Sequence, residues 1–156
     1  MTQFVLYGFG GHGRVIKDAI EKLGGEVVHI FDQNNPYDGS LYSECEIIIA
    51  IGNNEIRSSI SKSVKHKLGI IIHPDASVAS NVIINEGTVV LANAVIQSGS
   101  IVGKNCIVNA NVTVDHDVII EDNVSIYPGS YIGGEAKITQ GKTIDPNTTI
   151  VRNSVI

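Results

Sequence analysis

A strict six-residue repeat occupies the second half of the chain and constrains its fold more than any other feature. From Ile72 to Ile156, every sixth residue is Val or Ile. Neither an α-helix, with about 3.6 residues per turn, nor an alternating strand explains this period. A coil of short parallel strands does, because each hexad can form one flat side of a triangular coil with its aliphatic side chain pointing inward. We therefore predict an all-β coil over residues 74–156, with a core of stacked β-branched side chains.

The remaining positions of the repeat also follow rules. Four residues after each aliphatic residue stands a second, mostly small residue, from Val82 to Ser154, and only Lys142 departs from this pattern. Asn, Asp and Gly recur between the strands, where a left-handed backbone or a tight corner is easily accommodated. The repeat thus predicts a second inward position near each corner as well as the corners themselves.

The composition is that of an ordinary folded protein and argues against several classes of partner. The 156 residues are 43% hydrophobic and 17% charged, with a formal net charge of -5, which disfavours nucleic acid and anionic membranes as partners. No apolar run approaches the roughly 20 residues of a membrane span and the N-terminus lacks leader features, so we predict a cytoplasmic protein. Cys45 and Cys106 are far apart, and we expect reduced thiols, with no disulfide and no metal site.

Residues 1–73 alternate between strand and helix patterns. An apolar run at 3–7 leads into a glycine-rich turn, after which apolar residues recur at helical spacing as far as Leu23. Further strands are predicted at 26–31 and 46–51, a helix from about Glu55, and a last strand at 69–72 before a boundary at Pro74. This alternation predicts a small Rossmann-like parallel sheet over residues 1–73.

The carboxyl ends of these strands carry the candidate residues of a ligand site. A glycine turn between a strand and a helix lets the backbone approach a phosphate at the helix N-terminus, although the same glycines could serve only a tight turn and close packing. In a parallel sheet the strand ends meet in one crevice. We therefore predict a nucleotide-type site made by Gly8, Gly10, Gly11, His12, Gly13, Asp32, Gly52 and Asn53.

One histidine interrupts the otherwise monotonous turns of the coil. His116 stands between Asp115 and Asp117, two residues after the inward-facing Val114. Imidazole is the usual proton acceptor near neutral pH, and a neighbouring carboxylate can fix its tautomer and raise its basicity. We expect His116 near a corner, able to face a groove between subunits. It could be a solvated turn histidine, but we favour a catalytic base.

Four stretches of the chain carry a resemblance to a known family: residues 7–13, residues 49–57, His73-Pro74 and residues 114–134. Together they resemble the bacterial sugar acetyltransferases that join a small nucleotide-binding α/β domain to a left-handed hexapeptide β-helix. This group includes the bacillosamine-pathway and perosamine N-acetyltransferases and the sialic acid O-acetyltransferases. The resemblance spans most of the chain, and it implies that residues 74–156 form a left-handed parallel β-helix.

The resemblance also implies catalytic and cofactor roles. His116 matches the family's general base, which takes a proton from the acceptor amine, and Asp117 matches the acidic partner that orients it. Gly134 matches a glycine whose backbone N–H lies beside the acetyl carbonyl and could stabilise an oxyanion. Ser125 stands where the bacillosamine enzymes place a second histidine near the acetyl group, which implies a changed contact with the acetyl end of the cofactor.

Substrate and partner expectations follow from the same resemblance. His12 and Asp32 match residues that contact the nucleotide-sugar, and Asn109 matches a polar residue of the acceptor pocket. Acetyl-CoA is the expected co-substrate, no metal is required, and the active site lies between adjacent coils of a homotrimer. The chain lacks the family's last coil and closing tail, so we expect a reduced cofactor end. Lys137, Lys142 and Arg152 could meet cofactor phosphates there, or could equally be solvated surface residues.

The leading hypothesis is therefore an acetyl-CoA-dependent N-acetyltransferase acting on a nucleotide-linked amino-sugar, such as a UDP-linked 4-amino-4,6-dideoxy sugar. A sugar O-acetyltransferase is a variant within the same class. The alternatives are a non-catalytic scaffold that binds nucleotide-sugars, and an acyltransferase for a longer acyl chain or a non-sugar amine.

Overall fold

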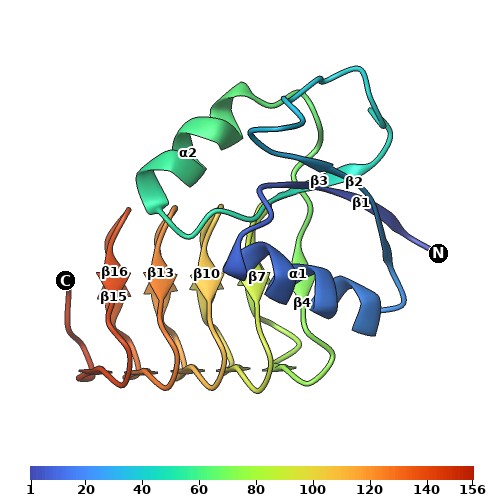
Figure 1. Cartoon of the computed structure of the whole chain (residues 1–156). Coiled ribbons are helices and arrows are strands. Elements are labelled where there is room, and N and C mark those ends of the chain that lie inside the picture. Colours follow the sequence, from blue (N-terminus) through green and yellow to red (C-terminus); the bar gives the residue numbers. More distant parts are fainter.

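The computed structural model describes all 156 residues and consists of a small α/β domain seated on one side of a long three-sided coil (Figure 1). The α/β domain contains β1 (Gln3–Tyr7), α1 (Gly11–Lys22), β2 (Glu26–Phe31), β3 (Glu46–Ile49) and α2 (Asn54–Ser63). The coil is made of two-residue strands: β4 (Ile71–Ile72), β5 (Ser77–Val78), β6 (Ile83–Ile84), β7 (Val89–Val90), β8 (Val95–Ile96), β9 (Ile101–Val102), β10 (Ile107–Val108), β11 (Thr113–Val114), β12 (Ile119–Ile120), β13 (Ser125–Ile126), β14 (Tyr131–Ile132), β15 (Lys137–Ile138), β16 (Thr143–Ile144) and β17 (Thr149–Ile150).

The coil has the triangular cross-section that the six-residue repeat predicts. Its strands form three parallel sheets, ordered β16-β13-β10-β7-β4, β17-β14-β11-β8-β5 and β15-β12-β9-β6. Each strand pairs with the strand 18 residues away, as Ile107 does with Ser125. The repeated aliphatic residues form one buried core cluster with the small residues of the second inward position, while Lys142 is exposed. Corner residues such as Asn93, Asn111 and Gly99 have positive φ, which confirms the predicted turns.

The α/β domain is a three-stranded parallel sheet in the order β2-β1-β3. Helix α1 lies between this sheet and the coil face that contains β4, β7 and β10 (Figure 1). One apolar cluster therefore joins the two parts, with Leu6 and Ile48 from the sheet, Ile16 from α1, and Val89 and Ile107 from the coil. Burial of this continuous apolar surface fixes the position of the α/β domain on the coil.

Three details differ from the sequence-based expectation. The segment predicted as the last strand of the small sheet belongs to the coil instead, because Ile71 and Ile72 pair with β7. Strand β3 ends at Ile49, two residues before the predicted end at Ile51. Helix α2 begins at Asn54, with Asn53 as its N-cap, one residue before the predicted start near Glu55. Its fully buried side chain is the charged Arg57, whereas the apolar Ile56 is 51% exposed.

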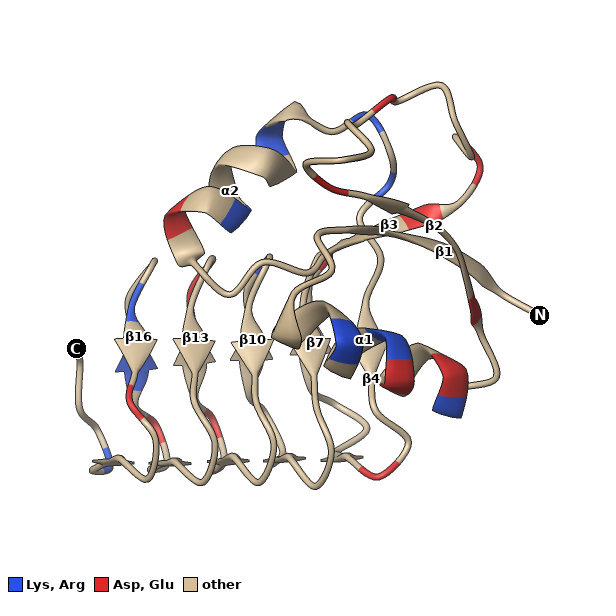
Figure 2. Ribbon diagram, viewed as in Figure 1, with Lys and Arg blue, Asp and Glu red and all other residues tan.

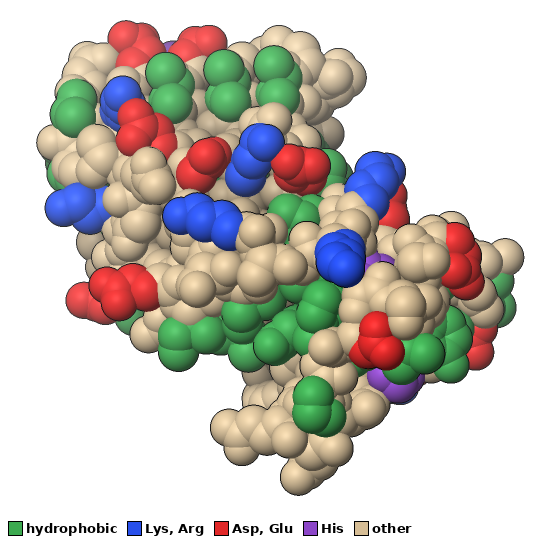
Figure 3. All heavy atoms as spheres, turned by 90° about the horizontal axis from the view of Figure 1, so that it is seen from above, with side chains coloured by type: hydrophobic (Ala, Val, Ile, Leu, Met, Phe, Trp, Pro, Cys, Tyr) green, Lys and Arg blue, Asp and Glu red, His purple; other side chains and the backbone are tan.

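Charged residues are spread over α1, α2, the loops and strand ends of the α/β domain, and the coil (Figure 2). Acidic and basic groups are interspersed on the face seen from above (Figure 3). Ion pairs such as Lys104–Glu86 and Lys137–Glu121 connect successive turns of the coil. Cys45 and Cys106 are buried free thiols. No helix has the length and hydropathy needed to cross a bilayer, and no group of three or more potential metal ligands is formed.

Candidate active site

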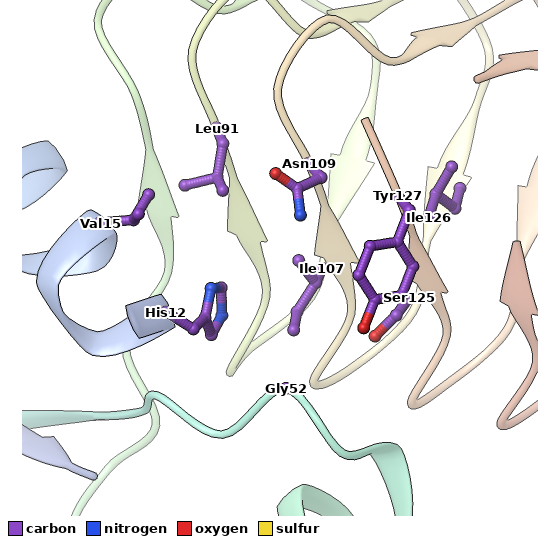
Figure 4. Close-up of a pocket in the computed structure, with 9 residues that line it drawn as sticks. All are labelled: His12, Val15, Gly52, Leu91, Ile107, Asn109, Ser125, Ile126 and Tyr127. Carbon is purple, nitrogen blue, oxygen red and sulfur yellow. The ribbon is translucent and has the colours of Figure 1, made fainter. Parts of the chain in front are cut away.

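The α/β domain contributes to two cavities, one lined by its own residues alone and one that it shares with the coil. The strand-end cavity, about 530 Å³, opens at the carboxyl ends of β1 and β2 and is lined by Tyr7, Gly8, Phe9, Gly10, Asp32, Gln33, Asn34, Ile51, Ile56 and Ile60. The seam cavity, about 240 Å³, lies between the start of α1 and the coil face, and is lined by His12, Val15, Gly52, Leu91, Ile107, Asn109, Ser125, Ile126 and Tyr127 (Figure 4).

The strand-end cavity brings together Gly8, Gly10 and Asp32. Gly8 has a φ of +94°, and a Cβ on Gly13 would lie 2.8 Å from the Gly8 carbonyl oxygen, so both positions require glycine. Helix α1 begins without a side-chain cap and without an acidic residue in its first turn, which leaves its first N–H groups open to an anion.

Asp32 shapes the loop beside this cavity. Its Oδ1 accepts hydrogen bonds from the backbone N–H groups of Asn34 and Asn35, at 2.8 and 2.9 Å. These bonds fix the carboxylate at the rim and leave Oδ2 without a partner inside the chain. The pocket thus combines a free carboxylate oxygen with an apolar wall formed by Ile56 and Ile60 of α2.

The seam cavity contains His12, Asn109 and Ser125, and Figure 4 shows His12 and Asn109 facing the same space from opposite sides. The Nε2 atom of His12 is buried and has no hydrogen-bond partner. Burial, together with the positive charge of Arg57, lowers the pKa of His12 to about 4. The ring is therefore neutral at physiological pH and presents an unpaired nitrogen to the cavity.

The other predicted ligand residues divide between these cavities and the surrounding framework. Gly52 lines the seam cavity. Gly11 and Gly13 line neither cavity, and neither does Asn53, whose side chain caps α2 by accepting the N–H of Ile56 at 3.0 Å. Ser125 is 3% exposed, and its hydroxyl donates to Asn54 Oδ1 at 2.6 Å.

Arg57 was not identified from the sequence. Its guanidinium is fully buried and donates to the carbonyl oxygens of Ile51, Gly52 and Asn105 and to the side chains of Asn54 and Ser125. Burial lowers its pKa to about 10, so it stays charged at neutral pH. A charged residue on a helix is usually assigned to the solvent-facing side. The spacing of apolar residues does not show when such a residue is instead buried and hydrogen-bonded to backbone carbonyl groups.

His116 and Asp117 form a hydrogen-bonded pair at the corner between β11 and β12. His116 Nδ1 lies 2.8 Å from Asp117 Oδ2, and Asp117 holds the left-handed φ of 58° required at this corner. A carboxylate can only accept, so Nδ1 carries the proton and Nε2 keeps its lone pair. The hydrogen bond to Asp117 is the main cause that raises the pKa of His116 above its ordinary value.

Gly134 lies directly against this imidazole. A Cβ at this position would be 2.9 Å from His116 Nε2, so only glycine lets the ring occupy its place. The Gly134 N–H makes no backbone hydrogen bond in the chain. Beside the pair, Asp115 accepts hydrogen bonds from the Tyr131 hydroxyl and from the backbone N–H of His116, both at 2.8 Å.

Within one chain, the His116–Asp117 pair and the two cavities are separate. The seam cavity lies on the face of β7, β10 and β13, whereas the pair lies at a corner that joins the other two faces, and it lines neither cavity. The structure therefore groups the predicted residues into two sets.

Comparisons with known proteins agree with this architecture. The family model described as the PglD N-terminal domain matches residues 3–64, and the bacterial transferase hexapeptide model (six repeats) matches residues 99–134. A search of curated proteins found no match.

Solved structures match over the whole chain. The acetyltransferase domain of PglB from Neisseria gonorrhoeae has 32% identity and a TM-score of 0.77, with coverage of 100% of this chain and 91% of that chain. The same domain in complex with acetyl coenzyme A has 33% identity and a TM-score of 0.76, covering 98% and 86%. A histidine-to-asparagine mutant of perosamine N-acetyltransferase from Caulobacter crescentus, in complex with CoA and GDP-perosamine, has 25% identity and a TM-score of 0.77, covering 100% and 89%.

Proposed function

The chain belongs to the acetyltransferase family that joins a PglD-type N-terminal domain to a left-handed hexapeptide β-helix, and we propose that it N-acetylates a nucleotide-linked amino-sugar with His116 as general base. It is an acyltransferase with acetyl-CoA as co-substrate. The observation that carries the proposal is the free Nε2 of His116, held by Asp117 and lying against Gly134. A UDP-linked 4-amino-4,6-dideoxy sugar is the substrate we expect, in a cytoplasmic enzyme.

The proposed reaction follows from the tautomer of His116. The substrate amine attacks the thioester carbonyl carbon while Nε2 takes the amine proton, and the Asp117 carboxylate stabilises the imidazolium that forms. The negative charge on the former carbonyl oxygen is met by the free N–H of Gly134. The C–S bond then breaks, and CoA leaves as the thiol with a proton returned by His116.

The proposed site is completed by a second copy of the chain. The strand-end cavity would hold the nucleotide, with the uncapped start of α1 near its phosphates and Asp32 at its rim. The sugar would extend from there toward His116 of a neighbouring copy, because the two sets of residues are separate within one chain. An exposed row of Ile83, Ile101 and Ile119 on adjacent coil strands supports association between copies in a homotrimer.

Thiol release from acetyl-CoA, measured with a panel of UDP- and GDP-linked 4-amino-sugars, tests the proposal. We expect turnover on one amino-sugar, and a fall of roughly 10²-fold or more in His116→Ala with unchanged folding, because the base is removed. An unchanged rate in His116→Ala would remove this residue from the mechanism. Absence of turnover by a folded wild-type protein on every member of the panel would favour the binding scaffold.

Product stability separates the two acceptor chemistries. An amide product keeps its acetyl group under mild base, whereas the ester made by an O-acetyltransferase is hydrolysed. Loss of the acetyl group under these conditions would reassign the acceptor from an amine to a hydroxyl.

A further inference from the structure

Arg57 occupies the partition between the two cavities without lining either of them. Its Nη1 donates at 3.0 Å to the carbonyl oxygens of Ile51, which lines the strand-end cavity, and of Gly52, which lines the seam cavity. Its Nη2 donates at 3.1 Å to Ser125, on the opposite wall of the seam cavity. Its Nε donates at 2.8 Å to the Asn105 carbonyl oxygen at a coil corner. One guanidinium thus connects the walls of both cavities to the coil.

These contacts need the shape of the guanidinium. Its donors lie in one plane and point in fixed directions, and here they reach backbone carbonyls and side chains from distant segments. Lys offers three donors on one nitrogen and could not span the same partners. No carboxylate forms an ion pair with Arg57. A buried cation held only by neutral acceptors is costly to form, and an apolar side chain could fasten α2 to the coil without that cost.

We propose that Arg57 is a positioning residue that fixes the position of the strand-end cavity relative to the seam cavity, so that a single nucleotide-linked substrate can occupy both. This rests on the proposed function, which supplies such a substrate. Arg57 acts through the Ile51-Gly52 segment and Ser125, because its own donors are already used within the chain. Its buried charge also disfavours protonation of His12, which lines a cavity whose only other titratable lining residue is Tyr127.

Steady-state kinetics of Arg57→Met and Arg57→Lys test the positioning role, with Arg14→Met as the matched control. Arg14 is exposed and lines neither cavity. We expect KM for the nucleotide-sugar to rise at least tenfold in Arg57→Met and by less in Arg57→Lys, while KM for acetyl-CoA stays within twofold. A nucleotide-sugar KM within twofold of wild type in folded Arg57→Met would overturn the inference.

Hydrogen–deuterium exchange tests the same role without a substrate. We expect the amides of residues 56 and 57, which donate to Asn53 at the end of this segment, to exchange at least tenfold faster in Arg57→Met than in wild type or Arg14→Met, with the buried coil strands unchanged. Unchanged exchange at residues 56 and 57 would overturn the inference. If wild type turns over no nucleotide-sugar, the proposed function fails while the exchange result still decides the role of Arg57. If Arg57→Met does not fold, Arg57→Lys carries both measurements, and a nucleotide-sugar KM and an exchange rate that both stay within twofold of wild type would overturn the inference.

Discussion

The unpaired ring of His12 makes the stability of the chain depend on pH. Its pKa of about 4 in the folded chain lies below the ordinary value of 6.5, chiefly because the ring is buried. Between these two values, the unfolded chain binds a proton here that the folded chain does not. The free energy of unfolding is therefore unaffected by this proton well above pH 6.5, and it decreases as the pH falls from 6.5 toward 4, because only the unfolded chain gains the proton.

The size of this effect follows from the two pKa values. Their separation corresponds to a loss of about 3 kcal/mol in the free energy of unfolding between pH 7 and pH 4. Urea denaturation of wild type and His12→Gln, at several pH values and one protein concentration, measures it. Asp38, Asp115 and Glu121, whose pKa values are lowered by hydrogen bonds, also cost stability in acid. They do so equally in both proteins, so the difference between the two isolates His12.

We expect the stability of wild type relative to His12→Gln to fall by about 3 kcal/mol between pH 7 and pH 4. A difference that stays constant within about 0.5 kcal/mol would refute the reasoning. It would mean that the ring is reached by solvent or finds a partner, and that its Nε2 atom is not buried and unpaired as described above.

Two further predictions concern the catalytic corner and the coil core. In Gly134→Ala, the added Cβ would lie 2.9 Å from His116 Nε2 and push the ring away, so kcat should fall at least tenfold without loss of thermal stability; an unchanged kcat would contradict the placement of the ring. Ile120→Ala removes a side chain that is 1% exposed in the coil core and should cost about 2–5 kcal/mol in urea unfolding. Lys142→Ala, on the exposed side, should cost less than about 0.5 kcal/mol, and equal costs would argue against the inward stacking of the hexads.

The coil could be predicted from the sequence because each position of the six-residue repeat has its own residue type, which indicates whether that position is buried or lies at a corner. Inward residues such as Val114 and Ile120 are selected by volume, and corner residues such as Asn111 by their tolerance of positive φ. The strands of the small sheet were predictable for a similar reason, since β1 and β2 are short apolar runs bounded by glycine. The strand at Ile71–Ile72 was misassigned because a buried parallel strand looks alike in either sheet.

The sequence predicted a set of candidate site residues but not their arrangement. The strand-end rule correctly gathers Gly8, Gly10 and Asp32, yet His12 faces a second cavity whose far wall comes from the coil. That wall depends on packing between segments far apart in the sequence, which no local pattern reports. The role of Arg57 was not predicted for a related reason. Most of its partners are backbone carbonyl groups, which every residue carries, so the sequence does not indicate which of them contact Arg57.

The most direct test of the central claim is the pH dependence of kcat/KM for N-acetyl transfer by wild type and Asp117→Asn. A base must be neutral to act, so wild-type kcat/KM should rise with pH to a plateau through an apparent pKa above 6.5, because Asp117 raises the pKa of His116. In Asp117→Asn the same step should move to lower pH, with a lower plateau. A wild-type profile that is flat between pH 5.5 and 9, or one that Asp117→Asn leaves in place, would contradict His116 as the general base.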